Sequence, residues 1–206
     1  MDDITVYLID DHAVMRRGLA SLLGTQRGIR VVGDVGDAAR GIREAAALKP
    51  DVVIMDLLMP EMDGVEATRR LKEIAPGIRI LILTTFGSAD GIGHALAAGA
   101  SGALVKTAEL PELLAAIRTT AAGGRAISPE IEQILTDDPP VPELTPRQAD
   151  VLASVTRGFS NEDIARQLGL SLGTVKEYLN TTFAKIGAAN RAEAVAIALR
   201  KHLLKF

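Results

Sequence analysis

The amino-acid sequence predicts an α/β domain with a doubly wound, five-stranded parallel sheet, followed by an all-α domain. Two observations lead to this prediction. Short apolar runs alternate with helical segments through residue 122, as expected of a parallel sheet whose strands are buried on both faces. A proline-rich stretch then separates this part from a region with helical periodicity alone. We therefore expect a first domain at 1–124, a short helix and linker at 125–143, and a helical domain at 144–206.

The composition is that of an ordinary soluble protein, with 48% hydrophobic and 24% charged residues in a chain of 206. The absence of cysteine excludes disulfides and thiolate zinc sites, and it suits a reducing cytoplasm. No apolar run approaches the roughly 20 residues that a membrane helix needs, and the acidic start does not resemble a signal peptide. We expect a cytoplasmic protein that does not enter the membrane.

Five apolar runs are the expected strands, at residues 5–9, 29–32, 52–55, 80–83 and 103–105. Each run precedes a segment with apolar residues at helical spacing. These helices are expected at 12–24, 38–48, 64–74, 89–98 and 109–121. Glycine or proline ends each of them, at Gly24, Pro50, Pro76, Gly99 and Gly123.

After the sheet, Ser128 and Pro129 predict a short helix at 128–136, because serine caps helices and proline suits the first turn. Three prolines and two aspartates within 137–142 predict a stiff, extended linker. Four helices are then expected at 145–157, 161–168, 172–185 and 191–204. A tight turn containing Gly169 joins the second to the third, and together they form a helix-turn-helix.

Carboxylates follow two strands of the predicted sheet. Asp10 and Asp11 end the first strand, and Asp56 ends the third. An aspartate after a strand is often only a turn former or helix cap. Here, however, the adjacent carboxylates of Asp10 and Asp11 repel each other unless a cation lies between them, and Asp56 arrives at the same edge of the sheet. Oxygen ligands without cysteine or a histidine cluster suit Mg²⁺.

A hydroxyl and an ammonium group follow the next two strands, at Thr84 and Lys106. Beside a Mg²⁺ site, these two groups are what a phosphoryl group needs. The hydroxyl donates a hydrogen bond to a phosphate oxygen, and the ammonium group neutralises developing charge.

Together these residues resemble the signature of a response-regulator receiver domain. The matching residues are Asp10, Asp11, Asp56, Met59, Pro60, Asp63, Gly64, Thr84 and Lys106, with 28 residues from Asp56 to Thr84 and 22 from there to Lys106. The resemblance implies a flavodoxin-like fold with strand order 2-1-3-4-5. It also implies that Asp56 accepts a phosphoryl group from a sensor histidine kinase, with Thr84 and Lys106 assisting. Mg²⁺ would be held by Asp10, Asp11, Asp56 and the backbone carbonyl of Leu58.

The sequence departs from this pattern on the face that transmits the signal. Many receivers carry an aromatic residue three positions before the lysine, where this chain has Ala103. Gly91 and Gly93 lie inside the fourth helix, where each glycine costs roughly 1 kcal/mol relative to alanine. One hypothesis is that this helix is loose until phosphorylation orders it, and the alternative is drift of a solvent-exposed sequence.

Other residues bear on the lifetime of a phosphoryl group and on the site's rim. Leu58 and Phe86 are apolar and lie two positions after Asp56 and Thr84, so neither can orient an attacking water, and we predict slow self-hydrolysis. The three histidines His12, His94 and His202 are scattered and read best as surface residues. His12 has the alternative of lining the rim of the site.

The C-terminal part is basic, with nine basic and five acidic residues at 144–206, whereas 1–136 has 14 basic and 18 acidic. This asymmetry favours a polyanionic partner for the C-terminal part. Residues 144–198 resemble the LuxR-type helix-turn-helix. The matching residues are Leu144 to Arg147, Val151, Leu152, Gly158, Ser160, Asn161, Ile164, Ala165, Leu168, Ser171, Gly173 to Lys176, Lys185 to Gly187 and Arg191.

The two resemblances together indicate the NarL/FixJ family of two-component response regulators and a double-stranded DNA partner. Lys176, Glu177 and Asn180 are expected to face the major groove, although Glu177 has the alternative of pairing with Lys176 or solvent. Phosphate contacts are expected from Thr174, Lys185 and Arg191. The last helix is implied to form a homodimer when the protein is phosphorylated or DNA-bound, through the side that carries its small residues, and we place the contact at Ala194, Ile197 and Ala198.

We therefore expect a phosphorylation-controlled transcription factor, not an enzyme in the usual sense, whose receiver catalyses its own phosphoryl transfer and slow dephosphorylation. One rival is an aspartyl-phosphate phosphatase, but that class needs a D-x-D motif on the first strand, and Asp10 and Asp11 are adjacent. The other rival is a constitutive DNA-binding protein whose receiver is only a dimerisation scaffold.

Overall fold

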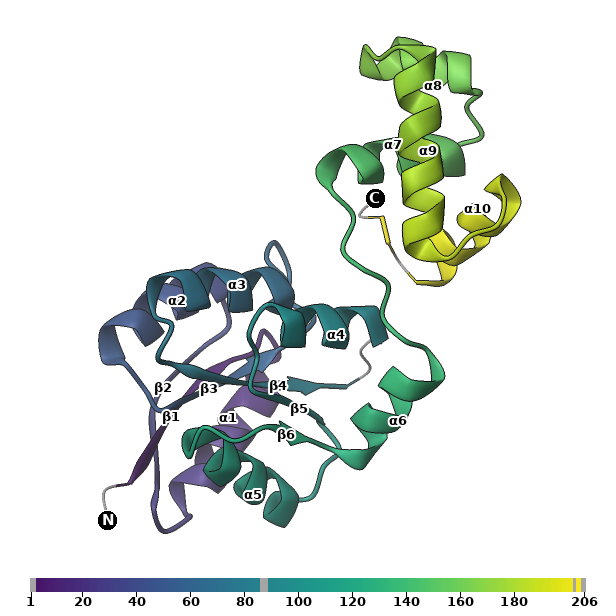
Figure 1. The fold of residues 1–206 in the computed structure, drawn as a ribbon. Coiled ribbons are helices and arrows are strands. Elements are labelled where there is room, and N and C mark those ends of the chain that lie inside the picture. Colours follow the sequence, from purple (N-terminus) through teal and green to yellow (C-terminus); the bar gives the residue numbers. More distant parts are fainter. Residues whose placement is uncertain (1–2, 86–88, 202, 205–206) are drawn as a thin grey trace. The chain divides into compact units, whose positions relative to one another are not determined.

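The computed structural model describes residues 3–85, 89–201 and 203–204 (Figure 1). The chain divides into two compact units, Met1–Pro140 and Val141–Phe206. Each unit has its own hydrophobic core. Within the described residues, no helix is both long enough and apolar enough to cross a membrane.

A six-stranded parallel sheet forms the centre of the first unit, in the order β2-β1-β3-β4-β5-β6. The strands are β1 (Ile4–Ile9), β2 (Ile29–Val35), β3 (Val52–Asp56), β4 (Arg79–Thr84), β5 (Gly102–Val105) and β6 (Ala126–Ile127). The order 2-1-3-4-5 is confirmed, but the expected count of five strands omits β6. That strand has only two residues, which is too short for a period of two to show in the sequence.

Helices cover both faces of this sheet (Figure 1). One face carries α1 (Ala13–Gly24) and α5 (Leu110–Ala121), and the other carries α2 (Ala38–Leu48), α3 (Gly64–Ile74) and α4 (Ala89–Ala97). Successive side chains of a strand point to opposite faces of the sheet. Val6 and Leu8 therefore pack on the face of α1 and α5, while Tyr7 and Ile9 pack on the face of α2, α3 and α4. Burial on both faces explains the unbroken apolar runs of the sequence.

The segment after the sheet packs against the first unit. α6 (Pro129–Asp137) begins where predicted, and the Ser128 hydroxyl accepts a hydrogen bond from the Ile131 amide at 3.4 Å. Ile131 is fully buried in the same core as Ile92 and Ala103. The residues expected to form a helix and linker are therefore part of the first unit as far as Pro140.

The second unit is entirely helical in its described residues, with α7 (Pro146–Thr156), α8 (Asn161–Leu168), α9 (Leu172–Ile186) and α10 (Arg191–Arg200). A side-chain cap begins each helix, and the capping residues are Thr145, Ser160, Ser171 and Asn190. Gly169 and Gly187 end α8 and α9 in the left-handed conformation, which favours glycine. The helix-turn-helix of α8 and α9 has the predicted bounds to within one residue, and α10 ends four residues before the predicted end.

Candidate functional site

Three aspartates and a histidine meet at the carboxyl end of the sheet. β1 and β3 are neighbours, with Ile9 opposite Met55, so Asp10 and Asp11 follow one strand beside Asp56 at the end of the other. Ligand atoms from Asp10, Asp11, His12 and Asp56 all lie within 4.8 Å of one another. The sheet register therefore brings together the carboxylates that the sequence predicted to share a site.

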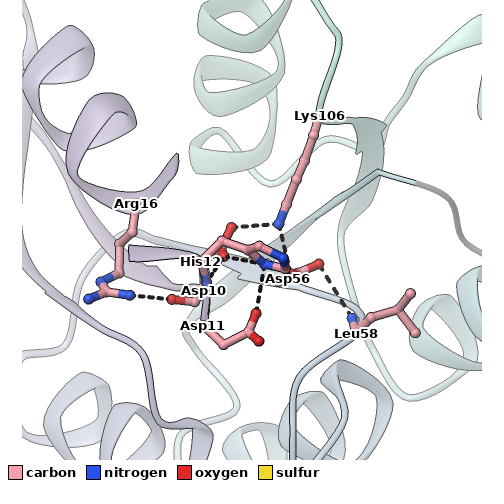
Figure 2. A network of polar contacts seen from close by, with 7 residues as sticks. All are labelled: Asp10, Asp11, His12, Arg16, Asp56, Leu58 and Lys106. Carbon is pink, nitrogen blue, oxygen red and sulfur yellow. Dashed lines mark hydrogen bonds and ion pairs between the residues drawn. The ribbon is translucent and has the colours of Figure 1, made fainter. Parts of the chain in front are cut away.

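Lys106 reaches this cluster from β5 (Figure 2). Its Nζ lies 2.7 Å from Asp56 Oδ2 and 2.7 Å from Asp10 Oδ2, and its side chain is only 5% exposed. The Lys106 amide donates to the Thr84 carbonyl at 2.7 Å, which extends the pairing of β4 and β5 by one residue and directs the long side chain across the strand ends. One ammonium group thus bridges two buried carboxylates.

Burial and the ion pair act in opposite directions on the pKa values of Asp56 and Lys106. Burial raises the pKa of the Asp56 carboxyl above its ordinary value, although the hydrogen bond and charge of Lys106 act to lower it. Burial alone would lower the pKa of Lys106, but its hydrogen bonds to Asp10 and Asp56 outweigh that effect and raise it. Lys106 therefore remains a cation in the site.

The donor set fits a hard divalent cation. Asp10, Asp11 and Asp56 offer carboxylate oxygens, the ligands that Mg²⁺ prefers. Apart from its ion pair with the His12 imidazole, Asp11 Oδ1 accepts no hydrogen bond within the described part of the chain, although it is buried. The Leu58 amide donates to Asp56 Oδ1 at 3.3 Å, which holds the Leu58 backbone beside the cluster. Coordination by the Leu58 carbonyl stays a prediction.

Thr84 ends β4 one residue beyond the pairing of Asp56 with Leu83. Its side chain is buried, and among the described residues its hydroxyl has no hydrogen-bond partner. A buried hydroxyl without a partner is costly, so it suits a group that gains an acceptor in another state of the protein.

The structure adds residues that the sequence argument did not assign. Arg16 Nη1 donates to the Asp10 carbonyl at 2.6 Å (Figure 2). Arg16 Nε donates to Asp34 at 2.8 Å, so the guanidinium fixes the strand end that carries the acid pair. No side-chain pattern of the sequence indicates the contact with Asp10, because the acceptor is a backbone carbonyl.

His12 takes the alternative position at the rim of the site. Its Nδ1 lies 2.9 Å from Asp11 Oδ1 and 3.4 Å from Asp10 Oδ1, while its side chain is 65% exposed. Leu58 is also exposed, at 57%, so its apolar side chain lies on the solvent side of Asp56. Phe86 and His202 lie outside the described residues. Slow self-hydrolysis stays a prediction.

Gly64 shapes the loop after Asp56. A Cβ at this position would lie 2.4 Å from the Asp56 carbonyl oxygen and 2.8 Å from Leu57 Cα, contacts that no side chain tolerates. The Gly64 amide donates to the Leu57 carbonyl at 2.8 Å, and Asp63 caps α3. The Asp63–Gly64 pair therefore holds the start of α3 directly against the end of β3.

In the second unit, Lys176, Glu177 and Asn180 lie on the exposed side of α9, as the prediction of a groove-facing surface requires. The Thr174 hydroxyl contacts the capping Ser171 hydroxyl at 2.9 Å. Lys185 donates to Gln148 at 3.3 Å. Arg191 donates to the Phe159 carbonyl and to Asn161, so it ties α10 to the start of α8. Their contacts with DNA stay predictions.

The prediction that places the dimer contact at Ala194, Ile197 and Ala198 is wrong. They are 0%, 7% and 2% exposed and pack with Leu152 and Ile186 in the core of the second unit. The sequence showed a small side and a large side of this helix but not which side meets α7 and α9. The exposed stripe of α10 instead contains Ala192, Ala196 and Leu199, together with the charged residues Glu193 and Arg200.

Comparisons with known proteins agree with this arrangement. Residues 6–118 match the family described as the response regulator receiver domain, and residues 142–198 match the bacterial regulatory proteins of the luxR family. The response regulator protein VraR of Staphylococcus aureus is 34% identical over 207 residues, covering 98% of this chain and 99% of that protein.

Solved structures give the same result. The response regulator ChrA of a heme-sensing two-component system is 35% identical, with a TM-score of 0.60 over 99% of this chain and 100% of that one. Salmonella RcsB, solved bound to a promoter with the phosphomimetic BeF₃⁻, has a TM-score of 0.68 over 95% of this chain and 98% of that one, and its 23% identity supports the fold alone. The chain therefore belongs to the response regulators in which a receiver domain is joined to a LuxR-type helix-turn-helix domain, and it is a DNA-binding transcriptional regulator.

Proposed function

We propose that Asp56 accepts a phosphoryl group from the phosphohistidine of a sensor kinase and that this modification controls DNA binding by α8 and α9. The observation that carries the proposal is the bridge from Lys106 to Asp56 and Asp10, together with the hydroxyl of Thr84 at the end of β4, which has no hydrogen-bond partner among the described residues. A cation, an acceptor carboxylate and a hydrogen-bond donor at one strand edge are the groups that phosphoryl transfer uses.

In the proposed step, a carboxylate oxygen of Asp56 attacks phosphorus, the new O–P bond forms, and the N–P bond of the donor breaks with its electron pair returning to the imidazole nitrogen. Lys106 then exchanges its bond to Asp56 for one to a phosphoryl oxygen. The Thr84 hydroxyl donates a hydrogen bond to another phosphoryl oxygen. A Mg²⁺ ion held by Asp10, Asp11, Asp56 and the Leu58 carbonyl would supply further neutralisation of the phosphoryl charge.

The second unit would read DNA through the exposed side of α9. Lys176 can donate to guanine O6 and N7, and Asn180 can pair with adenine, while Thr174 and Lys185 fix the register by contacting phosphates. We place pairing of two copies on the exposed stripe of Ala192, Ala196 and Leu199. Two half-sites about one helical turn apart would match such a dimer.

Acetyl phosphate with Mg²⁺ tests the first part of the proposal. Intact mass spectrometry is expected to show one added phosphoryl group that hydroxylamine removes, as for an acyl phosphate. Asp56→Asn is expected to gain none, and Asp51→Asn, another aspartate of the same unit, is expected to behave as the wild type. Modification that persists in Asp56→Asn would refute Asp56 as the acceptor.

Beryllofluoride with Mg²⁺ tests the control of DNA binding. In the wild type we expect a shift from monomer to dimer by light scattering and tighter binding of a duplex by fluorescence anisotropy, with no change in Asp56→Asn. If DNA binding ignores beryllofluoride while the mass assay succeeds, the receiver is a scaffold and the regulatory part of the proposal fails.

A further inference from the structure

Gly93 of α4 lies in close contact with Pro140 of the linker. A Cβ at Gly93 would lie 2.4 Å from Pro140 Cγ and 2.6 Å from Pro140 Cβ, so the pyrrolidine ring rests directly on the backbone of the helix. Glycine is unfavourable inside a helix, and here its missing side chain provides the space for the ring. The sequence-based hypothesis of a loose helix therefore has a structural alternative at Gly93.

The surface around this contact is hollow, and both apolar and polar residues line it. A depression of about 570 Å³ lies beside α4 and α6, and its lining includes Leu96, Ala97, Leu135 and Pro140. On the inner side, Ile131 anchors α6 in the core with Ile92 of α4. The chain is thus held to α4 twice, first by α6 and then, after α6 has ended at Asp137, by Pro140.

We propose that the Gly93 face of α4 is a docking surface for this chain's own linker, and that the seated Pro140 acts as a latch that shortens the tether of the helix-turn-helix unit. With the latch closed, meaning that Pro140 contacts Gly93, only residues 141–144 lie between this seat of Pro140 and the Thr145 cap of α7. These four residues span at most roughly 14 Å. With the latch open, the tether starts at Asp138 and spans at most roughly 25 Å. Reach governs how freely a tethered domain can find its binding geometry.

The inference goes beyond the proposed function and is tested without phosphorylation. The variants are Gly93→Ala, Pro140→Gly and their combination. Gly18→Ala is the matched control, because Gly18 lies inside α1 and an added Cβ there meets nothing within 4 Å. Gly18→Ala is expected to raise the Tm of the first unit by roughly 3 °C.

Thermal melting should separate the latch from plain helix propensity. In the wild-type background, Gly93→Ala is expected to lower the Tm or leave it unchanged, because the new methyl group meets Pro140. In the Pro140→Gly background, the same substitution is expected to raise the Tm as Gly18→Ala does. The effect of Pro140→Gly on the unfolded chain is present on both sides of this comparison and cancels.

Cleavage by the Glu-specific protease Glu-C after Glu143 reports the tether directly, since Glu143 is exposed and lies three residues beyond the seat. Gly93→Ala and Pro140→Gly are each expected to speed this cleavage by roughly fivefold, with no further increase in the combination and no change in Gly18→Ala, because cleavage follows the open population. The proposal is overturned if Gly93→Ala raises the Tm in the wild type and leaves cleavage at its original rate. Failure of Asp56 phosphorylation would leave it standing.

Discussion

Removing the cation from the acid cluster should cost the first unit much of its stability. In Lys106→Met, the carboxylates of Asp56 and Asp10, which are 3% and 11% exposed, lose the ammonium group 2.7 Å from each. Breaking a buried ion pair by deleting one partner typically costs 3–5 kcal/mol, because the remaining charge stays buried without compensation. We expect a loss of about 3 kcal/mol in the free energy of unfolding when chelator removes divalent cations.

Urea unfolding followed by tyrosine fluorescence measures this loss. The protein has two tyrosines and no tryptophan, so in a Tyr178→Phe background the buried Tyr7 reports the first unit alone. Lys49→Met removes an exposed lysine of the same unit and is expected to stay within about 0.5 kcal/mol of the parent. Excess Mg²⁺ is expected to restore part of the loss in Lys106→Met, because a cation returns to the site.

A double-mutant cycle with Asp56→Asn assigns the effect to this pair. The cost of Lys106→Met is expected to fall by at least about 1 kcal/mol when Asp56 no longer carries a charge. A cost below about 1 kcal/mol in the parent, or the same cost with and without the Asp56 charge, would refute the reasoning that Lys106 compensates buried carboxylates.

Three further predictions concern other parts of the chain. Gly64→Ala should slow phosphorylation by acetyl phosphate roughly tenfold, because the added Cβ displaces the Asp56 backbone. Gly24→Ala should not slow it, because an added Cβ at Gly24 meets nothing within 4 Å. Equal phosphorylation rates of the two variants by mass spectrometry would contradict this prediction. The Thr5 amide and hydroxyl donate to Asp51 at 2.8 and 2.6 Å and lower its pKa, so Asp51→Ala should cost about 1 kcal/mol near neutral pH in urea titrations. Because the folded pKa lies below the unfolded one, that cost should vanish as the pH falls through the folded pKa, and a cost that persists there would contradict it. Lys176→Ala should weaken DNA binding by about 1–3 kcal/mol and relax the preference for one guanine of the site, whereas an unchanged preference would contradict a base contact by Lys176.

The sequence pattern predicted the acid cluster more accurately than it predicted which helix faces are exposed. Asp10, Asp56 and Lys106 were placed together because each follows a buried apolar run, and parallel strands end at one edge of a sheet. Arg16 was missed because its contact is to a backbone carbonyl, which side-chain patterns do not reveal. Gly64 was predicted to begin a helix, but its closeness to Asp56 depends on how α3 meets β3.

The helix bounds were also largely predictable, since caps such as Ser128 and Ser171 and terminators such as Gly169 act on their immediate neighbours. β6 and the packing of α6 were not predictable in this way. A strand of two residues has no period, and its pairing depends on the close approach of Ala126 to Gly102, where a Cβ would lie 2.0 Å from the Ala126 carbonyl oxygen.

The sequence by itself determined the strands and helices, the acid cluster and the helix-turn-helix, because periodicity, capping and strand ends are properties of short stretches of chain. Only the tertiary structure decided that Ala194 and Ala198 face inward and that Gly93 receives Pro140. A small residue on a helix permits close approach from either side, and nothing local states which neighbour approaches. That choice is made by contacts between segments distant in sequence, whose packing fixes which face of each helix is buried.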